Sequence, residues 1–231
     1  MKRATTIIGA GLLGLASMSS ARIERPVPFK VGETLSYDVS WSSYLTAGTA
    51  TASVESKQPR LKSTVYKIVA EGRPLPLIAK IYALHYRAET LVDAYTLLPQ
   101  HAAVYIEEGA RKRTRETDFD RKTQPLACDA LSAIYALRAT IIGPGQKIRL
   151  QVVENGVTYA VRGEVAPPES VRALRAVVPA WKVTLTATDE KNQAAGRNMA
   201  LWISTDARRL PVRLQADLPV GNFNLVLRDV R

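Results

Sequence analysis

Four charged residues near the end of the chain, Asp206, Arg208, Arg209 and Arg213, are close enough in sequence to form a reactive or anion-binding cluster. They lie in the stretch ALWISTDARRLPVRLQADLPVGNF, where apolar and charged residues alternate. Successive side chains of a β-strand point to opposite faces of a sheet, so half-buried strands produce the same alternation. We therefore interpret these arginines as placed by the pleat on a basic surface, which could meet an anionic partner.

Other residues suited to acid–base or nucleophilic chemistry are few. The sequence has two histidines, His85 and His101, and one cysteine, Cys128. Glu89 and Asp93 are four residues apart, which in a strand separates them by roughly 13 Å. The sequence contains no His-Glu-x-x-His zinc motif, no Gly-x-Ser-x-Gly nucleophile motif and no phosphate-binding Gly-rich loop. We expect no catalytic residues, no metal and no cofactor, and we interpret Cys128 as a small core residue.

The first 21 residues have the three parts of a secretory signal peptide. Lys2 and Arg3 supply the positive start, residues 4–16 the apolar run, and Ser19-x-Ala21 a small-residue cleavage site. The apolar run is shorter than the roughly 20 residues that a membrane span needs. We expect residues 1–21 to be a cleaved signal peptide and residues 22–231 to be one exported periplasmic domain with no transmembrane segment.

The chain is basic, with a net charge of +11 over 231 residues. Lys2 and Arg3 are the only charged residues of the signal, so its removal leaves +9. A basic exported protein is expected to favour anionic lipid headgroups or anionic glycans, and export makes nucleic acid an unexpected partner. A single cysteine cannot form an internal disulfide, so packing must stabilise the fold.

The prevailing period along residues 22–231 is two, which is typical of half-buried strands. Residues 34–41 alternate clearly, with Leu35, Tyr37, Val39 and Trp41 on one face. Asn155-Gly156 accepts the positive φ angles of a tight turn, so residues 147–153 and 157–165 are predicted to form an antiparallel hairpin. Further strands are predicted at residues 49–56, 65–71, 181–187, 199–204, 212–216 and 222–228.

Two segments have helical spacing instead. Residues 75–84 place four apolar side chains on one side, and residues 129–141 do the same, with Asp129 at the expected N-cap. Many short strands with two short helices predict an α+β fold, built on one large curved antiparallel β-sheet that resembles half a barrel.

The apolar faces of these helices are the candidate ligand-binding residues, because a concave sheet and two helices could enclose an apolar ligand. The residues are Leu77, Ile78, Ile81, Leu84, Leu131, Ile134 and Leu137. The alternative is that they fill a solid core with no cavity. Arg111, Arg113 and Arg115 alternate within ARKRTRETDFDRK; they could contact an anionic headgroup, or form a solvated strand edge where charge discourages further pairing.

Three blocks in order, PFKVGETLSYDVSWSSYLTAGTATASV, TLVDAYTLLPQ and ALWISTDARRLPVRLQADLPVGNFNLVL, resemble the exported bacterial proteins of domain-of-unknown-function family 3108. The resemblance covers nearly all of residues 22–231 and implies no activity and no functional residues. The final block is also similar to periplasmic carriers of the LolA/LolB type, whose curved sheet wraps helices around an apolar cavity. The chain lacks their long first helix, so carriage of lipoproteins is not implied.

Two functional hypotheses follow from these patterns. The first is a non-catalytic periplasmic binder of an apolar or lipid-like ligand. The alternative is an envelope-associated structural or assembly protein that acts through envelope proteins, anionic surfaces or cell-wall glycans. A cavity would favour the first hypothesis, and a solid core with an exposed apolar patch would favour the second.

Overall fold

The computed structural model describes residues 23–41, 46–80, 83–141, 143–194, 196–218 and 221–231, so the expected signal peptide lies outside the described residues. No helix among these residues is both long and apolar enough to cross a membrane. In chain order the elements are β1 (Thr34–Trp41), β2 (Thr46–Arg60), β3 (Ser63–Pro74), α1 (Pro76–Ala79), β4 (Leu84–Asp93), β5 (Pro99–Glu108), β6 (Arg111–Asp118), β7 (Ala127–Cys128), α2 (Ala130–Thr140), β8 (Lys147–Glu154), β9 (Val157–Ala173), β10 (Ala176–Thr188), β11 (Arg197–Ser204), β12 (Pro211–Leu218) and β13 (Gly221–Val230).

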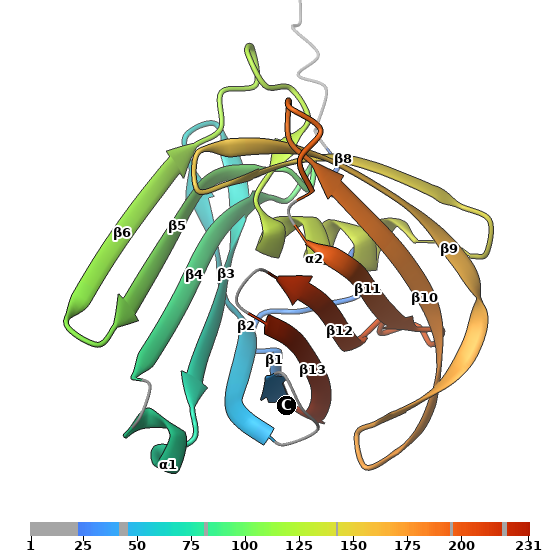
Figure 1. Cartoon of the computed structure of the whole chain (residues 1–231). Coiled ribbons are helices and arrows are strands. Elements are labelled where there is room, and N and C mark those ends of the chain that lie inside the picture. Colours follow the sequence, from blue (N-terminus) through green and yellow to red (C-terminus); the bar gives the residue numbers. More distant parts are fainter. Residues whose placement is uncertain (1–22, 42–45, 81–82, 142, 195, 219–220) are drawn as a thin grey trace, which may run out of the picture.

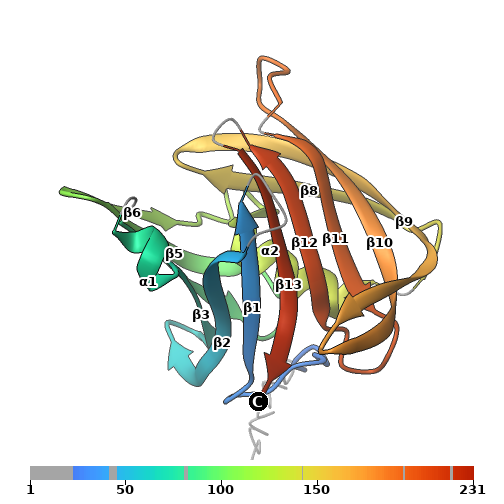
Figure 2. The same ribbon diagram turned by 60° about the horizontal axis from the view of Figure 1, so that its bottom comes forward.

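The strands form one 13-stranded sheet in the order β6-β5-β4-β3-β2-β1-β13-β12-β11-β10-β9-β8-β7. All neighbours are antiparallel except β7 and β8, which are parallel. The sheet curves around α2, and its two edges, β6 and β7, are not paired with each other, so it does not close (Figures 1 and 2). The predicted α+β fold with a half-barrel-like antiparallel sheet is confirmed.

The alternation near the end of the chain is the pleat of this sheet. Leu214 of β12 lies between Leu201 of β11 and Leu225 of β13, on the concave face. Arg213 takes the opposite face, where its guanidinium lies 4.9 Å from the centre of the Trp202 ring. The interpretation that strand geometry places the arginines is therefore confirmed for Arg213. It is wrong for Arg208 and Arg209, which lie in the turn between β11 and β12.

The predicted helix at residues 75–84 is wrong in extent. Helix α1 spans only Pro76–Ala79 and buries none of its residues, while Leu84 already begins strand β4 and pairs with Glu108 of β5. Pro76 occupies the first helical position, where a missing N–H is tolerated. One isolated turn is unstable by itself, whereas β4 hydrogen-bonds to β3 and β5 on both sides. Sheet pairing thus overrides the helical spacing of the apolar residues.

The second predicted helix is confirmed as α2. Asp129 is its N-cap, accepting a hydrogen bond from the Ser132 backbone N–H at 2.9 Å, while the Ser132 hydroxyl accepts one from the Asp129 N–H at 3.1 Å. This reciprocal capping box satisfies two backbone donors at the helix start. Leu131 and Tyr135 pack into a buried cluster with Phe29 and Ile68. The helix is thus fixed at its start and along one side.

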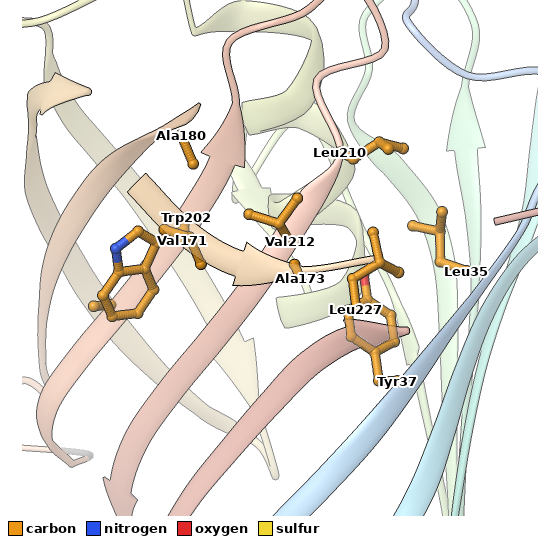
Figure 3. Close-up of a cluster of buried hydrophobic side chains, with 10 residues drawn as sticks. Leu35, Tyr37, Val171, Ala173, Ala180, Trp202, Leu210, Val212 and Leu227 are labelled. Atoms are coloured by element: carbon orange, nitrogen blue, oxygen red, sulfur yellow. The ribbon is translucent and has the colours of Figure 1, made fainter. Parts of the chain in front are cut away.

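The far end of the β9–β10 hairpin folds back onto the sheet. The Leu174 N–H donates to the Leu227 carbonyl of β13 at 2.7 Å. A buried cluster joins strands that are distant in sequence (Figure 3), and its members are Leu35, Tyr37, Val171, Ala173, Ala180, Ala200, Trp202, Leu210, Val212 and Leu227. This packing buries apolar side chains of a sheet that has no second sheet packed against it within the described chain.

The predicted hairpin turn is also confirmed. Asn155 has φ 53° and Gly156 has φ 77°, and Glu154 pairs with Val157 on either side of them. Positive φ at both central residues is the geometry of a type I′ turn, which matches the twist of antiparallel strands.

Replacing Gly156 by valine should lower the free energy of unfolding by about 1–3 kcal/mol, because a β-branched residue is strained at positive φ. The added Cβ would also lie 2.9 Å from Nη1 of Arg115, a flexible atom that can move away. Urea denaturation measures the change. Gly143→Val is the matched control, since Gly143 has no positive φ and an added Cβ would meet nothing within 4 Å. Equal stability of the two variants would contradict the turn's role.

Candidate functional site

Three adjoining hollows lie on the concave side of the sheet. The largest, here called the main cavity, has a volume of about 530 Å³ and lies between α2 and strands β8 to β11. Two smaller hollows have volumes of about 210 and 160 Å³. Tyr86 lines all three, and Ile134 lines both the main cavity and the 160 Å³ hollow. Tyr86 therefore stands where the hollows meet.

The walls of the main cavity are mostly apolar. Alanines on facing elements, Ala133 of α2 and Ala187 of β10, are buried and short, so space remains between the helix and the sheet. Ala130 and larger apolar side chains form most of the remaining lining, namely those of Ile106, Ile134, Leu137, Leu150, Val152, Val161, Leu185, Met199 and Leu201. The polar members are Tyr86, Glu154, Asn155 and Tyr159.

The candidate ligand-binding residues are distributed over the three hollows. Ile134 and Leu137 line the main cavity, and Leu131 with Ile134 lines the 160 Å³ hollow. Ile78 and Leu84 line the 210 Å³ hollow. Leu77 lines none of the three and is 71% exposed, and Ile81 lies outside the described residues. The strand residues of the opposite wall were not predicted.

The three arginines of β6 lie on the concave side at the edge of the sheet. Arg113 pairs with Ile106, which lines the main cavity, and Arg111 and Arg115 share the face of Arg113 because side chains alternate along a strand. All three are exposed, and Nη2 of Arg113 lies 3.6 Å from Oε2 of Glu108. Strand β6 is thus a charged edge strand whose arginines flank the cavity.

A carboxyl group that sequence reasoning missed stands at one end of the main cavity. Glu154, the last residue of β8, lines the main cavity and also a hollow of about 20 Å³ that it shares with Arg115 and Asp129. Burial raises the pKa of Glu154, and the nearby charge of Asp129 raises it further, while Arg115 acts in the opposite direction. The main cavity therefore has a carboxyl group at this end of a mostly apolar lining.

A buried ion pair, also missed, anchors α2. Arg138 Nη1 donates to Glu33 Oε1 at 2.6 Å, and Nη2 donates to Oε2 at 3.0 Å. The same guanidinium donates to the carbonyls of Arg209 and Arg208 at 3.1 and 3.2 Å. Arg138 lies seven residues after Leu131, on the apolar side of the helix. A charged residue at such a position is the sequence signal that could have revealed a buried ion pair.

The clustered charges of the β11–β12 turn do not converge on a reactive site. Asp206 accepts a hydrogen bond from the Ser204 hydroxyl at 2.7 Å and another from Arg208 at 3.3 Å. Burial tends to raise the pKa of Asp206, but these bonds lower it overall. The Arg209 guanidinium lies 4.6 Å from the centre of the Trp181 ring and donates to the Ile141 carbonyl at the end of α2. Arg209 thus holds the turn against the end of α2, while Asp206 and Arg208 bond to each other within the turn.

The histidines and the cysteine each bond to a separate partner and do not form a shared cluster. His85 Nε2 lies 2.6 Å from Glu71 Oε1, and His101 Nδ1 lies 2.8 Å from Asp118 Oδ1. Cys128 is 3% exposed, and its thiol donates to the Gln151 carbonyl at 3.3 Å. Burial, together with the nearby Asp129 charge, raises the pKa of Cys128 to about 12. Such a thiol stays protonated at neutral pH and is a poor nucleophile.

Comparison with known proteins identifies the family but no curated relative. The family model described as "Protein of unknown function (DUF3108)" matches residues 36–228. No curated protein matches the chain significantly.

Three solved structures resemble the chain at low identity. A β-barrel-like protein of domain of unknown function DUF1849 from Brucella abortus is 9% identical, with a TM-score of 0.47 over 86% of this chain and 96% of that one. A protein from Bacteroides fragilis, described as exported and YmcC-like in fold, is 12% identical, with a TM-score of 0.39 over 90% and 100%. A protein from Parabacteroides distasonis, described as a lipoprotein, is 8% identical, with a TM-score of 0.40 over 90% and 100%.

Proposed function

The chain belongs to the DUF3108 family of proteins of unknown function, and from its geometry we propose that it is a non-catalytic periplasmic binder of an apolar or lipid-like ligand. The main cavity carries this proposal. Its volume of about 530 Å³ falls within the roughly 300–1,000 Å³ of known ligand pockets. The signal-like segment at residues 1–21 supports the periplasmic location.

The composition of the cavity supports binding rather than catalysis. Ligand pockets are mostly apolar, with a few polar groups that orient the ligand, and the main cavity has four polar residues in a mostly apolar lining. A catalytic acid, base and nucleophile must lie within hydrogen-bond reach of one another. The histidines and Cys128 are instead occupied by separate partners on separate strands.

The arginines of β6 give the proposed binder a basic rim. Arg111 and Arg113 are exposed on the concave side, beyond the apolar wall that Ile106 contributes. We assign to them, with Arg115, contact with anionic headgroups at the cavity edge, through electrostatic attraction that salt would weaken. The lipid surface that delivers the ligand would supply these headgroups.

Replacing Ile134 by alanine tests whether this residue lines a cavity or belongs to a filled core. Ile134 is half-buried and faces existing space, so Ile134→Ala should lower the free energy of unfolding by less than about 2 kcal/mol, the lower limit for such changes in packed cores. The dissociation constant of the neutral dye Nile red should change at least threefold. Fluorescence titration and urea denaturation measure the two effects.

Ile203→Ala is the matched control for this test. Ile203 is fully buried in a packed cluster and lines none of the three hollows, so its loss should cost about 2–5 kcal/mol, with Nile red binding retained in the folded protein. If the wild type bound no Nile red and Ile134→Ala cost as much stability as Ile203→Ala, the proposed function would be abandoned.

A second candidate function rests on exposed apolar residues around the 210 Å³ hollow. Leu77 of α1 is 71% exposed and Trp41 is 39% exposed, and Trp41 stacks on Phe223 with ring centres 6.4 Å apart. Exposed apolar patches mark contact sites for proteins or membranes. This feature favours an envelope-associated assembly protein. Native mass spectrometry of protein isolated gently from the periplasm distinguishes the two, since a binder should retain an apolar molecule.

A further inference from the structure

Among the described residues, Glu154 has the one carboxyl group that lines the main cavity. It lies where β8 enters the Asn155-Gly156 turn, opposite Tyr86 of β4 and Ile106 of β5 across the open side of the sheet. Its carboxyl group makes no hydrogen bond or ion pair with any other residue that the structure describes. Its oxygen atoms are therefore available to whatever occupies the cavity.

The charged neighbours of Glu154 do not provide its carboxyl group with a hydrogen-bond or ion-pair partner. Asp129 has its own partners, because its Oδ2 accepts from the Thr90 hydroxyl at 2.7 Å and its Oδ1 accepts from the Ser132 N–H at 2.9 Å. Arg115 lines the neighbouring 20 Å³ hollow but forms no ion pair with Glu154 within the described chain. A half-buried carboxyl group without a partner is unfavourable, and a donor that reaches it gains a hydrogen bond stronger than one between neutral groups.

We propose that the ligand of the main cavity has a hydrogen-bond donor, a hydroxyl or an ammonium group, at the polar end of an apolar chain, and that Glu154 accepts this hydrogen bond. This inference rests on the proposed function and deepens it. It assigns the ligand to the class of long-chain alcohols or amines, or of lipids with such a terminal group. A long-chain carboxylate fits this end poorly, because its charge would lie near two carboxyl groups, Glu154 and Asp129, and only one arginine, Arg115.

Competition among matched amphiphiles tests the assignment. Dodecylamine, dodecanol and dodecanoate share one chain length and differ only in the terminal group. Each would displace Nile red from the wild-type protein at neutral pH. We expect dodecylamine to bind at least tenfold more tightly than dodecanoate, a difference of about 1.4 kcal/mol. The ratio between dodecylamine and dodecanol then distinguishes an ammonium from a hydroxyl group as the preferred donor.

The variant Glu154→Gln removes the charge and keeps an acceptor oxygen. Dodecylamine should lose at least tenfold in affinity, dodecanoate should gain affinity, and dodecanol should change less than threefold. Glu164→Gln is the matched control, since Glu164 is exposed on β9 and lines none of these hollows. It should leave all three affinities unchanged.

The outcomes separate this inference from the proposed function. If Nile red does not bind the wild type, the proposed function fails and this inference fails with it. If Nile red binds but dodecanoate competes as well as dodecylamine, or Glu154→Gln leaves the order of affinities unchanged, only the assignment of the polar end is overturned.

Discussion

Replacing Arg138 by methionine should lower the free energy of unfolding by about 3–5 kcal/mol, the usual effect of removing one partner of a buried ion pair. Arg138 is 1% exposed, and its two hydrogen bonds to Glu33 are its only bonds to a carboxylate among the described residues. Methionine would leave Glu33 buried without a partner, and the carbonyls of Arg208 and Arg209 would lose their donor. Urea denaturation gives the magnitude.

Two further variants show whether the ion pair is responsible. Arg162→Met on β9 removes an exposed arginine and should change stability by less than about 0.5 kcal/mol. Adding Glu33→Gln to Arg138→Met removes the stranded charge and should recover part of the loss. The anchoring role of Arg138 is refuted if the Arg138 and Arg162 variants are equally stable.

Filling the main cavity should strongly weaken the binding of apolar molecules. Ala133 of α2 and Ala187 of β10 contribute short side chains to facing walls. Phenylalanine at either position would occupy the space between them, so the affinity for Nile red should fall at least tenfold, which corresponds to about 1.4 kcal/mol. The fold should tolerate the added volume better than a packed core does, where overpacking typically costs 1–3 kcal/mol. Fluorescence titration measures the affinity.

Ala136→Phe is the control for the cavity-filling variants. Ala136 is half-buried on the same helix and lines none of the three hollows. This variant should bind Nile red like the wild type. Normal binding by both Ala133→Phe and Ala187→Phe, with their folds intact, would show that the dye binds elsewhere and that the main cavity is not the ligand site.

The features that sequence predicted are those with local causes. The turn at Asn155-Gly156 depends on two residues that accept positive φ, and the start of α2 depends on Asp129 and Ser132 within one helical turn. Alternation predicted most of the strands and their buried faces. Helical spacing failed as a signal for residues 75–84, where Leu77 and Ile78 belong to a single turn and Leu84 begins β4.

The features that sequence did not reveal depend on distant residues. Glu33 and Arg138 are 105 positions apart, and local patterns contain no signal that pairs them. Helical spacing placed Ile134 and Leu137 on one face, and both line the main cavity. The opposite wall includes Leu150 and Met199, whose alternation predicts a buried face but not a gap in front of it. The curvature of the whole sheet decides whether two buried faces touch.

The unpaired edges of the sheet bear on how a ligand could enter. The ladders run without interruption from β6 to β7, but in the described part of the chain no ladder joins these two edges. A closed barrel has a diameter fixed by its strand number and stagger, so widening it requires breaking backbone hydrogen bonds. Among the described residues, no backbone ladder crosses the gap between the two edges of this sheet, and side-chain packing such as that of Phe119 on Ala127 lies there instead. Separating the strands around Ile106 from those around Glu154 would therefore break side-chain contacts and leave every ladder intact.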